Sequence, residues 1–509
     1  MQVLSPKFKV QSWKWCWLIC LSVINSQLSI LHAQNITHGP VIGAVTSSSC
    51  KIYLRTKEPA RYVYVRCRPH NSGEVKMSSG ETTTQKDNST IISLINLRPD
   101  TKYMFSIEVN GKYDMVSGSF RTFPAEGAKG DYCFVTGSCQ ETENMKVFDA
   151  MPLNNPYFLM HTGDFTYPDY MIARNYADSQ AGIDSSYRRR YNEKVMKQML
   201  YNMPIDYVFD DDDYVGAGAG RYCTNDFKAW TKKGRIYYSM PGDTFPPHWR
   251  TNVIKGYADY FPHYNLPDST EGIFHSFKFG NAEFFVIDRN SNKDYPDGDA
   301  FKYDSVKKRW RFDPDSTLTL FGKKQMDWLK KSMLASTADW KFIVSGVPLN
   351  GACKKLIDAG VKIQQMHWGD WKGFQLALGF SRYWAGYPHE RNDFMQFVKQ
   401  HNIKNIVVIS GDTHHCVMDD GTNAGFPEMN SSGLSVATTE LAKYLKLIGH
   451  GLSLYRWKKV WNQGGIGVKS GECKNGFGKV RIVGTDYVEM SILDEDNKTV
   501  SRFKVPFKR

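Results

Sequence analysis

The sequence predicts an α/β fold preceded by a small all-β domain, and three observations carry this prediction. Short strand-like runs separated by turn residues fill the chain up to about residue 124. From Gly130 onward the pattern changes to apolar strand-like segments that alternate with helix-like segments. Of the 509 residues, 41% are hydrophobic and 14% are aromatic, which suits a chain with more than one packed core and excludes a disordered one.

The all-β part is predicted over residues 34–125. Its turns are signalled by Asn71-Ser72-Gly73, Arg98-Pro99-Asp100 and Asn110-Gly111. The run from Leu97 to Tyr103 resembles the turn-and-tyrosine signature of fibronectin type III modules, so we expect an immunoglobulin- or fibronectin-like sandwich. The predicted strands are 50–55, 62–68, 90–97, 103–109 and 117–122.

The α/β part is predicted over residues 130–509, after a short linker. Strand–helix alternation of this kind favours a layered core. Buried strands are expected at 132–136, 157–161, 205–209, 282–288, 340–345 and 403–410. Helices are expected at 185–201, 323–336 and 390–401, and the chain returns to strands at 480–483, 487–493 and 501–505.

Residues 1–33 have the features of a secretory signal peptide. Lys7, Lys9 and Lys14 precede an apolar run from about Trp15 to Leu31, and a small-residue cleavage site ends at Ala33. A signal-anchor helix is the alternative, but polar residues between 22 and 29 interrupt the run that a membrane-spanning helix needs. No later segment is apolar enough to cross a bilayer. We therefore expect a secreted or periplasmic protein with no transmembrane segment in the mature chain.

The net charge and the cysteine content exclude few classes of function. A formal net charge of +13 favours anionic partners such as phosphoesters, nucleic acid or a membrane surface, but a solvated basic face without function explains it equally well. Ten cysteines include no CxxC pair, which excludes a zinc ribbon. Export would permit disulfides. Cys50 and Cys67 lie on neighbouring predicted strands and are a candidate pair.

Four of the predicted strands run directly into side chains of the types that bind metals. In open α/β sheets, ligands bind beyond the carboxyl ends of the strands, so these side chains can converge on one centre. Each motif alone is weak, because a Gly-Asp pair after a strand is most often a turn and a buried cysteine is usually core packing. Four of them in one domain are informative. They contain Cys139, Asp164, Tyr167, Asp210 to Asp213, Asp412, His414 and His415.

This set of side chains suits phosphoester hydrolysis, which builds negative charge on the attacking and leaving oxygens. Two cations about 3.5–4 Å apart can bind the phosphoryl oxygens, acidify a water molecule and neutralise that charge. Hard cations prefer carboxylate and phenolate oxygens, whereas thiolate and imidazole suit a softer transition metal. Ligands of both kinds are present.

The order of the motifs resembles the calcineurin-like metallophosphoesterases, and more closely the PhoD-type alkaline phosphatases. That resemblance implies a layered sandwich of two β-sheets flanked by helices behind the N-terminal β domain. The matching segments are Ser138-Cys139-Gln140, the GDxxY element Gly163–Tyr167, the acidic element at 210–213, and the GDxHH element Gly411–His415. The resemblance extends over nearly the whole mature chain, because further similar segments lie at 38–40, 187–191, 325–341 and 384–391.

The resemblance also implies roles. A ferric ion would be surrounded by Cys139, Asp164, Tyr167 and His414. Asp164 would bridge to a second cation, calcium, held also by Asp211 and Asp412, and a hydroxide on or between the metals would attack phosphorus. Other divalent metals or a larger cluster would also fit. The remaining site candidates are Asp212, His415 and Arg391 as catalytic residues. Arg382, Arg391 and residues 443–459 are candidate phosphate contacts, although a solvated basic loop is the simpler explanation for any one of them.

Two positions depart from the family pattern. Asp212 stands where relatives have histidine, and Asp288-Arg289-Asn290 replaces Asp-Thr-Arg. A histidine would donate a proton near neutral pH, whereas an aspartate beside a cation stays ionised. We therefore expect Asp212 to be an additional oxygen ligand for calcium, and the second change to move or remove a basic contact.

The leading functional prediction is an exported phosphomonoesterase that releases phosphate. One alternative is a phosphodiesterase, of phospholipase D-like activity, acting on lipid headgroups, teichoic-acid-like polymers or nucleic acid. Another is a binding protein in which the altered acidic motif has silenced catalysis, although a silenced site has no need of all its ligands. The substrate is expected to be a small phosphoester or a phosphodiester polymer, without a specific nucleic-acid partner, and the oligomeric state is left open.

Overall fold

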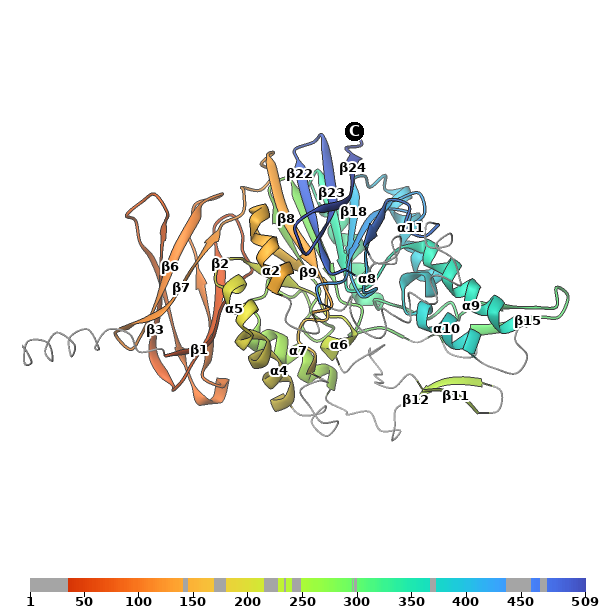
Figure 1. Cartoon of the computed structure of the whole chain (residues 1–509), viewed down its shortest axis with the longest axis horizontal. Coiled ribbons are helices and arrows are strands. Elements are labelled where there is room, and N and C mark those ends of the chain that lie inside the picture. The colour runs from red at the N-terminus through yellow and green to blue at the C-terminus, as the bar shows by residue number, and fades with distance from the viewer. Residues whose placement is uncertain are drawn as a thin grey trace, which may run out of the picture.

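The computed structural model describes residues 35–140, 145–168, 180–214, 228–232, 235–239, 249–294, 296, 300–366, 372–435, 459–466 and 474–509. The predicted signal peptide, residues 443–458, and Cys223 and Cys473 lie outside these residues. An N-terminal β-sandwich and a larger α/β sandwich lie side by side, with helices between them (Figure 1). Within the described part of the chain, no helix has the length and apolar character needed to cross a membrane.

The N-terminal region is all-β, as predicted. Three strands form one sheet, in the order β1-β2-β5, and four form the other, in the order β4-β3-β6-β7. The predicted strands are present, while β1 and β4 were not predicted, and β4 has only one buried residue. The strands are β1 (Ile36–Gly43), β2 (Cys50–Thr56), β3 (Ala60–Pro69), β4 (Lys76–Thr82), β5 (Ser89–Leu94), β6 (Lys102–Val109) and β7 (Lys112–Arg121).

Two side-chain details of the N-terminal sandwich were predicted from the sequence, and one of them is present. The backbone N–H of Arg98 donates to the hydroxyl of buried Tyr103 at 2.9 Å, as the turn-and-tyrosine signature predicts. The suggested disulfide between Cys50 and Cys67 is wrong, because both are free buried thiols. Their strands, β2 and β3, follow one another along the chain but belong to different sheets.

Two mixed sheets form the α/β sandwich. A six-stranded sheet has the order β10-β9-β8-β22-β23-β24, and a seven-stranded sheet has the order β13-β14-β17-β18-β20-β19-β21. The first contains β8 (Asp131–Gly137), β9 (Leu159–His161), β10 (Ile205–Tyr207), β22 (Gly476–Val483), β23 (Tyr487–Asp494) and β24 (Thr499–Pro506). The second contains β13 (His275–Phe279), β14 (Ala282–Ile287), β17 (Trp340–Ser345), β18 (Ile406–Ser410), β19 (Cys416–Asp420), β20 (Pro427–Ser431) and β21 (Gly464–Ile466).

Parallel pairing aligns the carboxyl ends of the strands that carry the predicted ligands. Strands β8, β9 and β10 run parallel in one sheet, and β14, β17, β18 and β20 run parallel in the other. Aromatic rings fill the space between the sheets: Phe284 stacks on Phe342 with centroids 4.6 Å apart, and Phe134 meets Phe284 at 5.2 Å. The C-terminal strand β22 pairs antiparallel with β8, so the end of the chain completes the first sheet.

Helices surround the two sheets. The single helix predicted at 185–201 is two helices, because Glu193 adopts an extended conformation (φ −61°, ψ 132°) and starts the second one. The helices are α2 (Met145–Ala150), α4 (Gln180–Asn192), α5 (Lys194–Leu200), α6 (Asp211–Tyr214), α7 (Trp249–Tyr260), α8 (Lys323–Ala335), α9 (Lys354–Met366), α10 (Lys372–Ser381) and α11 (Pro388–Gln400). Two hairpins stand apart from the main sheets: β11 (Lys228–Lys232) with β12 (Arg235–Ser239), and β15 (Phe301–Asp304) with β16 (Arg309–Phe312).

The two sandwiches share an extensive contact. Tyr53 of β2 packs against Tyr191 of α4 and Tyr260 of α7, with ring centroids 5.3 and 5.8 Å apart. Asp87 accepts hydrogen bonds from Arg188 of α4 and from the hydroxyl of Tyr260. The predicted boundary near residues 125–130 falls in a segment without helix or strand. The hydrophobic core nevertheless continues from one sandwich into the other.

Candidate metal centre

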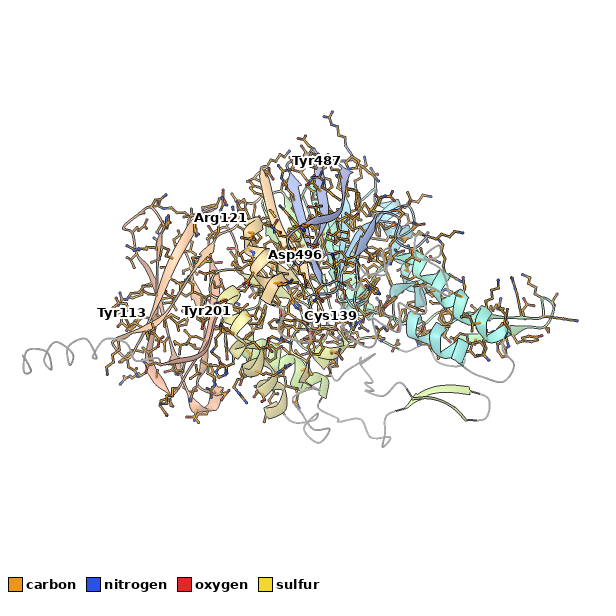
Figure 2. The ribbon with its side chains drawn as sticks, viewed as in Figure 1. Tyr113, Arg121, Cys139, Tyr201, Tyr487 and Asp496 are labelled. Atoms are coloured by element: carbon orange, nitrogen blue, oxygen red, sulfur yellow. The ribbon has the colours of Figure 1, made fainter. Side chains whose placement is uncertain are left out.

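Loops from both sheets of the α/β sandwich meet at one place and bring together side chains that can bind metals. Ligand atoms of Cys139, Asp164 and His414 lie within 4.8 Å of one another, as do those of Asp164, Asp210 and Asp211. Cys139 lies near the middle of the molecule, just beyond the end of β8 (Figure 2). Asp164 belongs to both groups, which is the geometry expected of a carboxylate shared by two cations.

The backbone at the predicted ligands is unusual. Five of the six predicted metal ligands have a positive φ: Cys139 (60°), Asp164 (57°), Tyr167 (48°), Asp412 (72°) and His414 (57°). The left-handed region costs a non-glycine residue about 1–2 kcal/mol, and such residues cluster at functional sites where the surroundings hold them in place. Cys139, Tyr167 and His414 lack the short Asn or Asp side chain that is usual in this conformation, which makes these loops candidates for a functional site.

Asp213, the last residue of the acidic element, holds the loop that carries Asp164. Its carboxylate accepts the backbone N–H groups of Asp164 at 2.7 Å, Phe165 at 2.8 Å and Thr166 at 2.7 Å. Burial raises the pKa of Asp213, and these hydrogen bonds act in the opposite direction. Sequence reasoning gave Asp213 no role of its own, since nothing in an Asp-rich run distinguishes a ligand from a residue that caps backbone groups.

Two glycines allow the loops that carry the predicted ligands to approach one another closely. A Cβ atom on Gly163 (φ 98°) would lie 2.4 Å from the Cβ of Asp210, and one on Gly411 would lie 2.4 Å from the carbonyl oxygen of Thr162. Gly163 and Gly411 are the glycines of the two Gly-Asp elements. Their role is to let loops from three strands pack directly against one another.

Ser432, just beyond β20, connects ligands from the two sheets. Its hydroxyl lies 3.0 Å from the Cys139 thiol and accepts the backbone N–H of His414 at 2.8 Å. An isolated bridge between Ser138 and Ser432 joins the loops. This residue was missed by sequence reasoning, because it lies 293 positions from Cys139 and belongs to no recognised motif.

The electrostatics of the centre favour cations. Burial, followed by the charges of Asp212 and Asp210, raises the pKa of Asp164 well above its usual value. Burial and the charge of Asp164 likewise raise the pKa values of Cys139 and Tyr167. A bound cation would reverse these shifts, because it stabilises carboxylate, thiolate and phenolate. The donor set therefore fits one transition metal and one harder cation.

Two arginines pair with the acidic residues. The guanidinium of Arg382 spans Asp211 at 3.0 Å and both carboxylate oxygens of Asp412 at 2.8 Å. Arg289 is fully buried, hydrogen-bonds Asp210 and lies 3.6 Å from Asp211. Thus the basic contact of the Asp288-Arg289-Asn290 segment is present one position earlier than in the family pattern. Lys293 is a further buried basic residue, and burial followed by the charge of Arg289 lowers the pKa of its amine well below the usual value. Neither its position nor its burial had a signal in the sequence.

The predicted catalytic residues lie in different surroundings. The backbone N–H of Asp212 donates to Asp164 at 3.0 Å, so Asp212 borders the centre. His415 is buried, and burial followed by the charge of His414 lowers its pKa to about 4. Arg391 of α11 donates to the carbonyl of Ala424 at 2.8 Å instead of contacting a predicted ligand. The catalytic roles of these three residues stay predictions.

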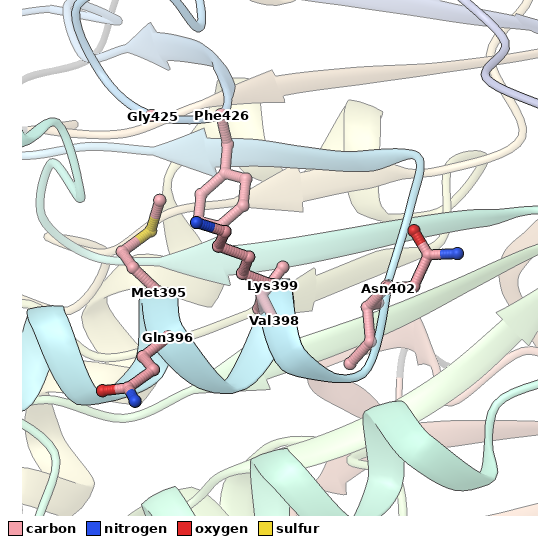
Figure 3. Close-up of a pocket in the computed structure, with 8 residues that line it drawn as sticks. Met395, Gln396, Val398, Lys399, Asn402, Gly425 and Phe426 are labelled. Carbon is pink, nitrogen blue, oxygen red and sulfur yellow. The ribbon is translucent and has the colours of Figure 1, made fainter.

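A separate hollow lies on the outside of the α/β sandwich. It has a volume of about 710 Å³ and is lined by α11 and the chain before β20, including Met395, Val398 and Phe426 (Figure 3). None of the predicted site residues lines it. The convergent loops, and not this hollow, are therefore the candidate active site.

Comparisons with known proteins agree with this geometry. The family model described as PhoD-like phosphatase matches residues 134–443. "Alkaline phosphatase D" of Bacillus subtilis (strain 168) is 24% identical over 340 residues, which cover 62% of this chain and 52% of that protein. The alignment thus spans about half the length of this curated relative.

Solved structures support the fold. A structure of PhoD superposes with a TM-score of 0.65 at 16% identity, covering 94% of this chain and 93% of that chain. A purple acid phosphatase from yellow lupin (Lupinus luteus) gives a TM-score of 0.52 at 10% identity, covering 92% of this chain and 74% of that chain. At these identities the likeness concerns the fold alone, which is the predicted two-sheet sandwich flanked by helices.

Proposed function

The chain belongs to the PhoD-like phosphatase family, and from that premise we propose that it is a metal-dependent phosphoester hydrolase that releases phosphate from monoesters. The observation that carries this proposal is the position of Asp164. Its carboxylate is common to two groups of potential ligands, one containing Cys139 and His414 and the other containing Asp210 and Asp211.

We assign Cys139, Asp164, Tyr167 and His414 to a ferric ion. Asp164, Asp211 and Asp412 would hold calcium, and Asp212 would add an oxygen ligand at the edge of the calcium site. When bound, such metals would supply charge neutralisation for the phosphoryl group and acidify a water molecule. The support for this assignment is the donor chemistry, together with the burial and the neighbouring acidic charge that raise the pKa values of Cys139, Asp164 and Tyr167.

Arg382 is the residue that we assign to substrate phosphate. Its guanidinium already faces Asp211 and Asp412, and 21% of its side chain is exposed. A planar guanidinium can bind two phosphoryl oxygens at once, so Arg382 would orient a phosphate placed against these carboxylates. Arg289, fully buried on Asp210, would instead fix the acidic loop in position.

Export to a secreted or periplasmic location is also part of the proposal. It rests on the basic, apolar and small-residue order of residues 1–33. An exported phosphatase would meet small phosphoesters outside the cytoplasm.

The test uses the purified full chain with p-nitrophenyl phosphate and bis(p-nitrophenyl) phosphate. We expect turnover of the monoester, loss of that turnover after chelation, and recovery when iron and calcium are both restored. Full activity after exhaustive chelation would overturn metal dependence. Turnover of the diester alone would identify a phosphodiesterase, and no turnover with metals bound would indicate a binding protein.

A further inference from the structure

The hairpin of β15 and β16 has no part in the metal centre. It projects from the side of the α/β sandwich, past α9 and α10, at the opposite end of the molecule from the N-terminal sandwich (Figure 1). Its register pairs Phe301 with Phe312, Tyr303 with Trp310, and Lys302 with Arg311. The two strands pair only with each other, so the hairpin extends neither main sheet.

One face of the hairpin is aromatic. Residues two apart on a strand, and their cross-strand partners, share a face, which places Phe301, Tyr303, Trp310 and Phe312 together. At the base, Phe301 packs on Phe374 of α10 with centroids 4.3 Å apart. Further out, Tyr303 contacts Trp310 at 5.4 Å but is itself 54% exposed. The face is therefore anchored at its base and open toward its tip.

The other face and the turn are basic. Lys302 and Arg311 share Asp313, at 3.4 and 3.1 Å. The carboxylate of Asp304 accepts backbone N–H groups of the turn. Among the described residues, no carboxylate lies within ion-pair distance of the three cations that follow along the turn. These are Lys307, Lys308 and Arg309, and all are exposed.

One apolar side chain accompanies these cations at the tip, and another lies where α9 meets the hairpin. Val306, in the turn itself, is 90% exposed. Met366, at the end of α9, is 66% exposed, and its neighbour Gln365 donates to the carbonyl of Trp310 at 3.1 Å. A basic turn with an exposed valine and adjoining aromatic and methionine side chains is the composition of a segment that lies in a membrane interface.

We propose that this hairpin binds the surface of anionic lipid bilayers and holds the protein there. The cations would face the phosphate headgroups, while Val306 and Tyr303 would enter the boundary between headgroups and acyl chains. A soluble polyanion would explain the cations but offers no apolar region for Val306. The proposal does not depend on the activity assigned above, because it uses none of the residues of the metal centre.

The experiment is co-sedimentation of the full chain with vesicles of phosphatidylcholine, with and without phosphatidylglycerol. We expect binding only to the anionic vesicles, weakened by added salt. The triple variant Lys307→Gln, Lys308→Gln, Arg309→Gln should bind about 100-fold more weakly, since each cation near an anionic surface contributes about fivefold. Val306→Ser should weaken binding by a smaller factor of about fivefold.

A matched control removes the same charge elsewhere. Lys57→Gln, Arg61→Gln, Lys112→Gln changes three exposed cations of the N-terminal sandwich and should leave vesicle binding unchanged. All variants should melt as the parent does, which shows that they are folded. Equal loss in both triple variants, or unaltered binding by the hairpin variant, would overturn the proposal. The proposal would also fail if the protein bound heparin or single-stranded DNA instead of vesicles, and if Val306→Ser left that binding unchanged.

Discussion

The turns of the N-terminal sandwich and the loops of the metal centre use the same backbone conformation for different purposes. In the N-terminal turns, most non-glycine residues with positive φ are asparagine or aspartate: Asp87, Asn88, Asn96, Asp100 and Asn110. Short polar side chains tolerate this region because they hydrogen-bond to nearby backbone groups. At the metal centre, Cys139, Tyr167 and His414 adopt the same conformation without that advantage.

The difference lies in what maintains each conformation. An N-terminal turn is closed locally, as where the N–H of Asn88 donates to the carbonyl of Thr83 at 2.8 Å. The metal-centre loops are held from a distance: Asp213 caps the loop of Asp164, 49 residues away, and Ser432 supports Cys139, 293 residues away. Backbone strain maintained by remote residues is therefore the better marker of a functional site.

The largest effect expected is on activity. Asp164→Asn keeps the shape of the side chain but removes the charge shared by both ligand groups, and should lower turnover of p-nitrophenyl phosphate by at least about 100-fold. Asp100→Asn makes the same change at a left-handed aspartate of the N-terminal sandwich and should leave kcat unchanged. Comparable losses in both variants would break the distinction between turn and site.

The next effect concerns the contact between the two sandwiches. Burial acts against ionisation of Asp87, but hydrogen bonds from Arg55 and Tyr260 outweigh it and lower the pKa of Asp87 to about 2. Asp87→Asn should lower the free energy of unfolding by about 1–2 kcal/mol, measured by urea denaturation at pH 7. The difference in the free energy of unfolding between the parent and the variant should be fully present above pH 3.8 and disappear as the pH falls through about 2.

This second prediction also has a defined contrary result. Asp149→Asn removes an exposed carboxylate of α2 that has no part in the contact, and should change stability by no more than about 0.5 kcal/mol. If Asp87→Asn shifted only a separate transition of the N-terminal sandwich, the two sandwiches would unfold independently, contrary to their shared core.

The smallest expected effect is a change in stability caused by backbone strain at His414. His414→Gly should stabilise the chelated, metal-free protein by about 0.5–1 kcal/mol, since glycine adopts φ 57° without cost. Asn96→Gly, at the same φ of 57° in an N-terminal turn, should change stability by only a few tenths of a kcal/mol. Thermal melts of both variants give the comparison, and equal shifts would show that the centre stores no more strain than a turn.

Local patterns in the sequence were sufficient to predict much of the fold. Strand β17 has the predicted bounds, Trp340–Ser345, and the helix predicted at 323–336 is α8, Lys323–Ala335. A continuous apolar run and an amphipathic helical pattern depend on neighbouring residues alone, so the element that each one predicts does not depend on contacts with distant segments. The hairpin of β15 and β16 was not predicted, because its turn contains Lys308 at φ 47° where glycine or asparagine would have signalled it.

The candidate site was predictable to a different degree. The motifs predicted the loops that meet, and the structure brings Cys139, Asp164 and His414 within ligand distance. The supporting residues Asp213 and Ser432 were not predicted, because their roles depend on contacts between segments far apart in the chain. A disulfide between Cys50 and Cys67 was wrong because the spacing of two cysteines along the chain does not fix the distance or orientation of their thiols.

The central claim, a ferric ion bound by the Tyr167 phenolate beside Cys139, is tested most directly by the visible absorption spectrum of the purified protein together with its metal content. A phenolate on Fe³⁺ produces a charge-transfer band, so the protein should be coloured and contain iron. Tyr167→Phe should lose the band. Tyr187→Phe, which alters another buried tyrosine outside the centre, should keep it. A colourless, iron-free protein with full phosphatase activity would contradict the assignment.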